Sequence, residues 1–129
     1  HSKYIVIWAC NSVSTNLHHW AIVQDAQKKG AKVVVIDSYK SRTAKLADWH
    51  IMPKPGTDGA LAMAIINSII ENDFVDNDYV QKYTNGFEEL KEHSKTKTPA
   101  WASKITGIFY SNYSKMFLTF PYYLPILIY

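Results

Sequence analysis

Three short polar stretches carry the residue types that can hold a phosphorylated ligand. They are "WACNSVST" (8–15), "DSYKSR" (37–42) and "KPGTD" (54–58). Each follows an apolar run that predicts a β-strand, and ligands of open parallel sheets bind outside the carboxyl ends of the strands. We therefore treat the three stretches as one candidate binding site, in which we predict no catalytic residue and no metal ligand.

The first stretch offers amide and hydroxyl groups before a predicted helix. Asn11, Ser12, Ser14 and Thr15 stand where unpaired backbone N–H groups and the positive helix end would stabilise a diphosphate. Helix capping alone explains the same residues. The stretch lacks every glycine of the G-x-G-x-x-G pattern, which argues against an ordinary nicotinamide site.

The second stretch begins with an acidic residue at the end of a strand. Asp37 occupies the place where a carboxylate accepts hydrogen bonds from ribose hydroxyls in nucleotide-binding folds. An Asx turn within the loop explains Asp37 equally well. Arg42 could approach a phosphate through its forked guanidinium group, and a solvated loop arginine is the alternative.

The third stretch precedes a long apolar run. Thr57 or Asp58 would cap the following helix after Pro55 and Gly56, which explains these residues without a ligand. Alternatively, the Asp58 carboxylate accepts two N–H groups from a guanine edge, and Gly56 lets the base approach the backbone. The sequence leaves both interpretations open.

Composition excludes several classes of function. A chain of 129 residues fits one ordinary domain, and 14 basic against 11 acidic residues give a net charge of +3, too small to indicate nucleic acid or an anionic membrane as partner. Cys10 is the only cysteine, so an internal disulfide and an all-cysteine zinc site are excluded. The first residues have no export-signal pattern, and we expect a cytoplasmic location.

The apolar pattern predicts alternating strands and helices. Residues 4–8, 32–37 and 49–52 form short apolar runs typical of buried parallel strands, and residues 14–30 predict a helix capped by Ser14 or Thr15. From residue 57 onward the apolar surface is so broad that we expect a helix buried against the sheet. The sequence thus predicts an α/β fold.

The rest of the chain divides into helical pieces and a tail. Asp78, Gly86 and Thr98-Pro99 punctuate three shorter predicted helices. Residues 108–129 differ, with eight aromatic residues, two prolines and no acidic residue. The apolar end of this tail falls short of the roughly 20 residues that a membrane helix needs, and we predict no membrane span.

The order of five segments resembles the molybdopterin oxidoreductase family, which includes formate dehydrogenases and thiosulfate, polysulfide, dimethyl sulfoxide and nitrate reductases. The segments are "YIVIWACNSVSTN", "AKVVVIDSYKSRTAKLAD", "MPKPGTDGALAMAI", "YTNGFEELKEH" and "TPAWASKITG". The likeness covers residues 4–108. It implies a partial family domain over residues 1–107, three-layered and Rossmann-like, with a short parallel sheet flanked by helices and a helical C-terminal part. The tail over 108–129 stays of unclear origin.

The resemblance also implies a cofactor. Family enzymes carry molybdenum or tungsten held by the dithiolenes of two molybdopterin guanine dinucleotides. The loop from Trp8 to Thr15 would lie along one dinucleotide, the loop from Asp37 to Ser41 would meet its ribose and guanine end, and Gly56 to Asp58 would contact guanine. The implied cofactor-binding residues are Trp8, Ala9, Cys10, Asn11, Ser12, Thr15, Asp37, Ser38, Tyr39, Arg42, Gly56, Thr57 and Asp58.

Two positions depart from the family pattern. Ala9 stands where the family usually has glycine, and its methyl group would crowd a close backbone approach to phosphate. Ser38 replaces a usual proline, which loosens the turn after Asp37.

Full members of the family are several hundred residues long, with an iron–sulfur domain in many branches and a metal-ligating cysteine, selenocysteine or serine. We therefore expect a fragment or truncated reading frame that is inactive alone, binds no cofactor in isolation, and has the remaining domains of the parent oxidoreductase as partners. The alternative is a noncatalytic α/β module that self-associates into a homo-oligomer through its exposed apolar faces and tail.

Overall fold

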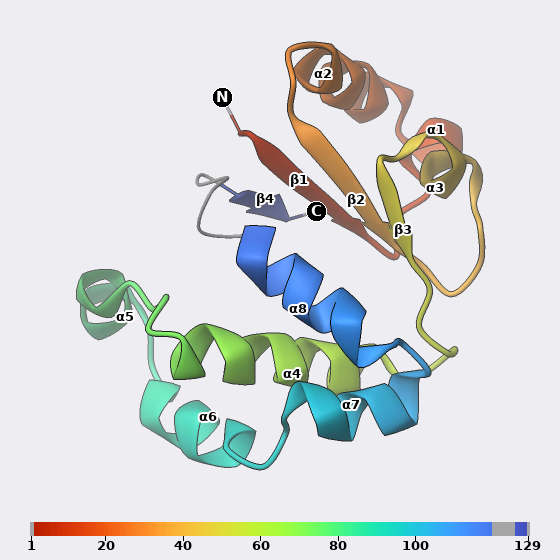
Figure 1. The fold of residues 1–129 in the computed structure, drawn as a ribbon. Helices are drawn as coiled ribbons and strands as arrows, with labels where there is room; N and C mark the ends of the chain where they lie inside the picture. Colours follow the sequence, from red (N-terminus) through yellow and green to blue (C-terminus); the bar gives the residue numbers. More distant parts are fainter. Residues whose placement is uncertain (1, 120–125, 129) are drawn as a thin grey trace. The chain divides into compact units, whose positions relative to one another are not determined.

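The computed structural model describes residues 2–119 and 126–128, which fall into two compact units (Figure 1). The sheet unit lies within His1–Pro53 and Thr119–Tyr129, and the helical unit comprises Lys54–Leu118.

The sheet unit contains a parallel sheet of four strands. These are β1 (Tyr4–Trp8), β2 (Lys32–Ile36), β3 (Trp49–Ile51) and β4 (Ile126–Ile128), in the order β3-β2-β1-β4. All three pairings are parallel. The three strands predicted from the sequence are confirmed. The fourth strand was not predicted, and it lies in the tail, of which residues 120–125 and 129 lie outside the described part of the chain.

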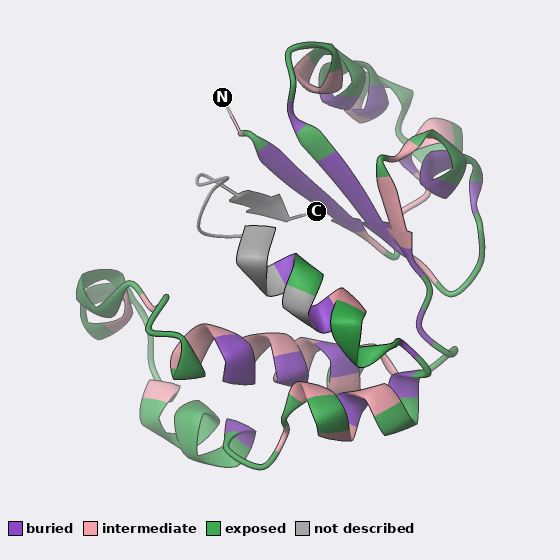
Figure 2. Ribbon diagram, viewed as in Figure 1, coloured by how far each residue is buried: buried purple, intermediate pink, exposed green. Residues whose placement is uncertain are grey.

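The two central strands are buried along nearly their whole length (Figure 2). Every residue in Tyr4–Ile7 and Val33–Ile36 is buried, as expected for the near-continuous apolar strands of a parallel sheet. On one face Ile5, Ile7, Val33 and Val35 form a core with Trp20, Val23 and Ala44 from the helices. The predicted α/β class with a parallel sheet flanked by helices is confirmed.

The connection from β1 to β2 is two helices instead of the single predicted one. A short turn of helix, α1 (Ser12–Thr15), ends at Asn16, and α2 (Leu17–Lys28) starts there. The Asn16 side chain accepts a hydrogen bond from His19 N at 3.2 Å and so caps α2. The prediction of a cap at Ser14 or Thr15 was wrong, because the Thr15 hydroxyl instead donates to Asn11 O at 3.0 Å.

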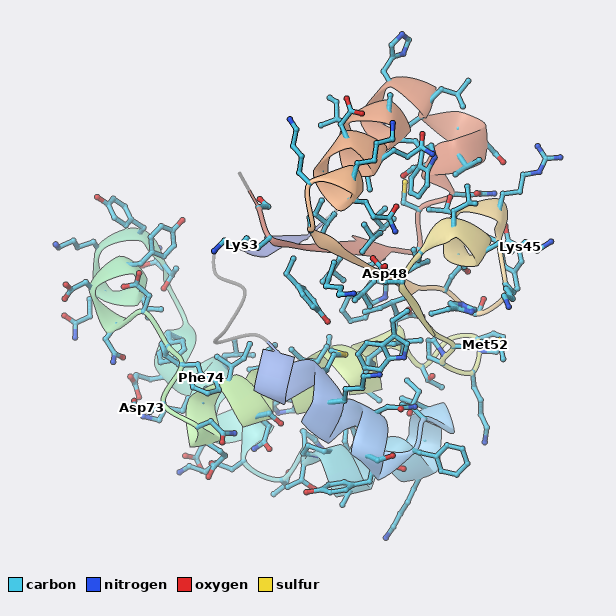
Figure 3. The ribbon with its side chains drawn as sticks, turned by 45° about the horizontal axis from the view of Figure 1, so that its top comes forward. Lys3, Lys45, Asp48, Met52, Asp73 and Phe74 are labelled. Carbon is cyan, nitrogen blue, oxygen red and sulfur yellow. The ribbon has the colours of Figure 1, made fainter. Side chains whose placement is uncertain are left out.

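Asp48 fixes the start of β3 after the short helix α3 (Arg42–Leu46). Figure 3 labels Asp48. Its Oδ2 accepts from Val33 N at 2.8 Å and from Gln27 Nε2 at 3.1 Å, and its own N–H donates to Val33 O at 2.9 Å. One carboxylate therefore connects α2, β2 and the entry to β3, although Asp48 itself is exposed.

The helical unit is built around α4 (Asp58–Glu71), which packs against α6 (Phe87–Ser94) and α7 (Pro99–Thr106). Leu61 and Ala64 of α4 are fully buried, and the buried Asn67 donates from Nδ2 to Ser94 O at 3.1 Å. The predicted apolar helix is confirmed within its unit. Its expected position against the sheet concerns the other unit and stays a prediction.

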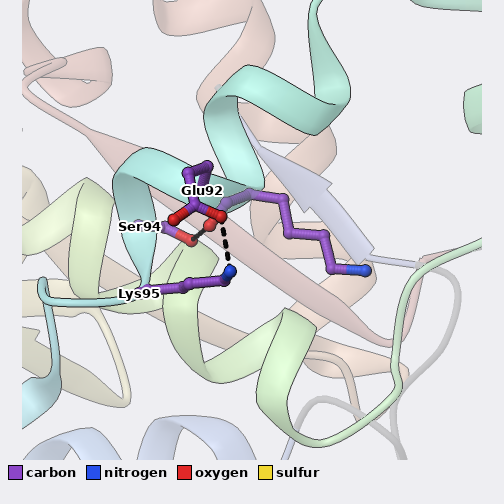
Figure 4. A network of polar contacts seen from close by, with 4 residues as sticks. Glu92, Ser94 and Lys95 are labelled. Carbon is purple, nitrogen blue, oxygen red and sulfur yellow. Dashed lines mark hydrogen bonds and ion pairs between the residues drawn. The ribbon is translucent and has the colours of Figure 1, made fainter.

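Helices α5 and α6 lie mostly at the surface of this unit. The short helix α5 (Asn77–Tyr83) buries none of its residues, and Asp76 caps it through a hydrogen bond from Tyr79 N at 2.9 Å. At the end of α6, Lys95 donates to Glu92 in an exposed ion pair (Figure 4). This hydrogen bond raises the pKa of Lys95, although exposed pairs of this kind add little to stability.

Helix α7 begins at the predicted residues Thr98-Pro99, and an unpredicted helix follows it. Thr98 caps α7 by accepting from Trp101 N at 3.3 Å, Pro99 is its first residue, and Gly107 ends it with a φ of 74°. The following helix α8 (Tyr110–Thr119) was not predicted. Among residues 2–119 and 126–128, no helix is long and apolar enough to cross a membrane.

A buried hydroxyl pair joins α7 to α8. The Thr106 hydroxyl donates to Ala102 O at 2.9 Å, so the Tyr113 hydroxyl, 2.8 Å away, donates to Thr106 Oγ1. Ile108 N also donates to Thr106 Oγ1, at 3.2 Å. Burial raises the pKa of Tyr113, because the phenolate would lose its hydration.

We expect Tyr113→Phe to lower the free energy of unfolding by about 1 kcal/mol at neutral pH, because one buried hydrogen bond is lost. A pKa raised in the folded state stabilises the fold below the unfolded pKa of about 10 and stops doing so as pH rises further. The variant should therefore lose less stability above pH ~10 than the parent. Urea unfolding across this pH range measures both effects, with the exposed Tyr110→Phe as control; an identical alkaline loss in parent and Tyr113→Phe would contradict the assignment.

Candidate functional site

The first two predicted stretches meet at one edge of the sheet unit. β1 and β2 are parallel neighbours, with Trp8 opposite Ile36, so the loops that follow them leave from the same edge. The Ala9 N–H donates to Ile36 O at 2.9 Å and extends this pairing by one residue. The predicted proximity of the two loops is therefore present in the structure.

Ala9 holds the first loop in a left-handed turn. Its φ is 51°, a value that costs a residue with a β-carbon about 1 kcal/mol or more. Glycine takes this conformation without that cost, which explains in physical terms why glycine was expected here. The exposed alanine methyl group lies at the edge where a ligand would approach.

Ser12 lies inside the unit, with its side chain fully buried. Its hydroxyl is 3.4 Å from Cys10 Sγ and 3.1 Å from His19 Nδ1. In this conformation the Ser12 side chain connects the loop to α2, and Cys10 is half-buried beside it. Direct ligand contacts by these two residues stay predictions.

Asn11 connects the first loop with the second. The Thr43 hydroxyl donates to Asn11 Oδ1 at 2.9 Å, and Asn11 Nδ2 donates to the Tyr39 hydroxyl at 3.5 Å. Val13 N donates to Thr43 Oγ1 at 3.1 Å. Thr43 is fully buried and was not predicted. The only available signal was its place in the first turn after the capping residue Ser41, which indicates a helix start and no more.

Asp37 forms an Asx turn, which was one of the two roles considered for this residue. Its Oδ1 accepts from Tyr39 N at 3.4 Å, and its backbone carbonyl accepts from His50 Nε2 at 3.0 Å. Asp37 N donates to Ile51 O at 3.1 Å, which connects the loop to β3. The half-buried carboxylate therefore has a fixed position at the site edge, and the ribose interpretation remains compatible with the turn.

Two exposed cations follow Asp37 along the chain. Lys40 and Arg42 follow Asp37 within five residues, and both are exposed, as are Ser38 and Tyr39. Trp8 is half-buried at the end of β1 and Thr15 is exposed on α1. The donor set of hydroxyls, an amide and two cations suits an anionic oxygen ligand such as a diphosphate. The described residues contain no group of three or more His, Cys, Asp or Glu side chains that could hold a metal ion.

The third predicted stretch belongs to the helical unit. Thr57 is the N-cap residue of α4, but its hydroxyl donates to Lys54 O at 2.7 Å instead of capping the helix. Gly56 has a φ of 79°, and a β-carbon placed there would have no atom within 4 Å. The half-buried Asp58 is the first helical residue. The turn is thus open above Gly56, as the guanine interpretation requires.

We expect Ala9→Gly to raise the free energy of unfolding by about 0.5–1 kcal/mol, because removal of the β-carbon relieves the left-handed strain. Ala47 has a φ of −78°, and Ala47→Gly should instead lower stability through the greater freedom of the unfolded chain. Thermal and urea unfolding of the two variants give the comparison. Equal losses in both would show that Ala9 carries no strain.

A sequence model of the molybdopterin oxidoreductase family matches residues 1–118. The chain is 48% identical over 108 residues to the probable oxidoreductase YoaE of Bacillus subtilis, a match that covers 84% of this chain and 16% of the relative. It is 44% identical over 86 residues to the F420-dependent formate dehydrogenase subunit alpha of Methanocaldococcus jannaschii, covering 67% of this chain and 13% of that subunit.

The fold also matches a solved structure. Acetylene hydratase from Pelobacter acetylenicus superimposes with a TM-score of 0.86 and 29% identity, over 98% of this chain and 18% of that protein. This chain therefore spans less than a fifth of the length of each of these relatives. The family match includes most of α8 and so extends past residue 108, where the sequence likeness was expected to end. The chain belongs to the molybdopterin oxidoreductase family.

Proposed function

We propose that this chain is the part of a molybdenum or tungsten oxidoreductase that binds a section of a molybdopterin guanine dinucleotide, and that it has no turnover alone. The observation that carries the proposal is the joined pair of loops at the carboxyl edge of β1 and β2, connected through Asn11, Thr43 and Tyr39. In α/β sheets this edge is the usual place for nucleotides.

The residues at the edge fit the diphosphate and ribose of such a ligand. Ala9 is exposed at this edge in a left-handed turn, and Lys40 and Arg42 supply positive charge for phosphate oxygens. Asp37 is held by its Asx turn, and it would accept hydrogen bonds from ribose hydroxyls. When bound, the metal and its dithiolenes would supply electron transfer, and the residues of this chain would bind and orient the nucleotide end.

For the helical unit we propose a contact with guanine. The Asp58 carboxylate would accept two N–H groups from the guanine edge, a charge-assisted pair of hydrogen bonds. The open space above Gly56 supports a close approach of the flat base to the backbone. The hydroxyl of Thr57 stabilises the turn itself, through Lys54 O.

The test is calorimetric titration of the folded chain with GDP and ADP at millimolar concentrations. Asp37→Asn keeps an Asx-turn acceptor and should weaken both nucleotides about tenfold, whereas Asp58→Asn should weaken GDP selectively. Neither change should cost much stability.

Asp25→Asn is the matched control, because it removes the same charge from an exposed α2 residue whose ion pair with Lys28 spans 3.5 Å. Loss of a negative charge alone would strengthen nucleotide binding, so weaker binding marks a lost contact. Absence of heat with the folded parent, or binding by Asp58→Asn equal to that of the parent, would contradict the corresponding proposal.

A second candidate function is self-association through surfaces that a longer polypeptide would cover. Tyr79 and Tyr83 on α5 are 57% and 71% exposed, with ring centroids 5.1 Å apart, and Phe74 before this helix is 46% exposed (Figure 3). Exposed aromatic groups of this size are typical of interaction surfaces. Since the chain spans 16% of YoaE, we propose that the rest of a parent oxidoreductase covers them.

We expect the isolated chain to self-associate with rising concentration, and Tyr79→Ser/Tyr83→Ser to reduce this association because it removes the exposed aromatic area. Light scattering across a dilution series measures the mass. Ile22→Ser, at a position of α2 that is 70% exposed and lies outside α5 and the tail, is the control and should change little. A parent chain that stays monomeric at high concentration would remove this candidate.

A further inference from the structure

We propose that Thr43 is a positioning residue that sets the direction of a hydrogen-bond relay from the backbone of Val13 through Asn11 to Tyr39. Because of this relay, hydrogen-bond donors face the ligand at this edge of the sheet unit. The edge therefore selects ligands with anionic oxygen acceptors such as a diphosphate. This inference rests on the proposed nucleotide site and deepens it by assigning the polarity of that site.

The first step of the relay is fixed by the single proton of a hydroxyl group. Val13 N–H can only donate, and it donates to Thr43 Oγ1 at 3.1 Å. The Thr43 proton is then directed to Asn11 Oδ1, 2.9 Å away. Thr43 is fully buried, so water does not compete for this hydroxyl.

The second step follows from the asymmetry of an amide group. Since Asn11 Oδ1 faces Thr43, the amide nitrogen must lie on the opposite side, where Nδ2 is 3.5 Å from the Tyr39 hydroxyl. An amide NH₂ group donates and does not accept. The Tyr39 oxygen therefore accepts from Asn11, and its own proton is directed away from Asn11.

The third step concerns what the ligand meets. Tyr39 is 56% exposed at the edge of the site, and its backbone N–H is held by Asp37 Oδ1 at 3.4 Å. With the relay in this direction, the Tyr39 hydroxyl is a donor toward solvent or ligand. Together with the exposed charges of Lys40 and Arg42, this donor favours phosphate oxygens over ligands that bring N–H or O–H groups.

If Thr43 only supported the fold, its variants would change ligand affinity in a different pattern than if it orients the hydrogen-bond donors. Thr43→Val removes the hydroxyl at nearly constant volume, whereas Thr43→Ser keeps it. Tyr39→Phe removes the last donor at an exposed position, where the fold is not at risk. The double variant Thr43→Val/Tyr39→Phe tests whether the two residues act through one chain of hydrogen bonds.

The experiment measures the affinities of GDP and inorganic pyrophosphate for these variants by calorimetry. We expect Thr43→Val and Tyr39→Phe each to bind pyrophosphate about tenfold more weakly, because one hydrogen bond to a charged group is lost. Thr43→Ser should bind like the parent, and the double variant should be no weaker than Tyr39→Phe alone. In the ligand-free chain, the nitrogen-15 resonance of the Asn11 side-chain amide should shift in Thr43→Val and stay in place in Thr43→Ser.

Each other outcome is decisive. Parent-like pyrophosphate affinity in Tyr39→Phe overturns the relay even if Thr43→Val does not fold, and so does an additive loss in the double variant. A Thr43→Ser variant that loses as much affinity as Thr43→Val reduces Thr43 to a packing role. A folded parent that binds neither GDP nor pyrophosphate overturns the proposed function and the relay with it, whereas binding that is indifferent to Thr43 overturns the relay alone.

Discussion

The parallel pairing of β1 with β2 is the constraint on which the sheet unit depends. It places Trp8 opposite Ile36, and the Ala9 N–H continues the pairing into the loop. The two loops must then leave from one edge, because parallel strands end on the same side. The left-handed turn at Ala9 and the Asx turn at Asp37 follow directly at that edge. Any ligand bound there would use the geometry that this pairing sets.

Much of the fold could be predicted because its signals are local. The apolar runs of 4–8 and 32–37 predict strands, and Thr98-Pro99 and Gly86 mark helix starts that the structure confirms at α7 and α6. The break at Asn16 was missed because Ser14, Thr15 and Asn16 are all good capping residues, and only three-dimensional contacts choose among them. β4 and α8 were missed because the aromatic tail has neither strand alternation nor clear helix caps.

The candidate site, like the fold, could be predicted only in part. The order of strands and loops predicts which stretches lie at the carboxyl edge, and the family match supports their assignment to a molybdopterin enzyme. Thr43 could not be predicted, because its hydrogen bond to Asn11 joins residues 32 positions apart. Ser12 had the residue type of a ligand contact, but its burial beside His19 depends on how α2 packs. Spacing along a chain identifies loops better than it identifies the direction of each side chain.

Helix α5 has no buried residues, and this affects how the helical unit opens. A helix of seven residues has too few turns to be stable alone in water, and α5 gains no core packing among the described residues. Its free energy of local opening must therefore be small compared with that of α4, whose Leu61 and Ala64 are fully buried. The backbone amides of α5 would exchange with solvent through local fraying, without global unfolding. The unit would thus have a graded stability, highest where α4 packs against α7 and lowest at the aromatic surface of α5.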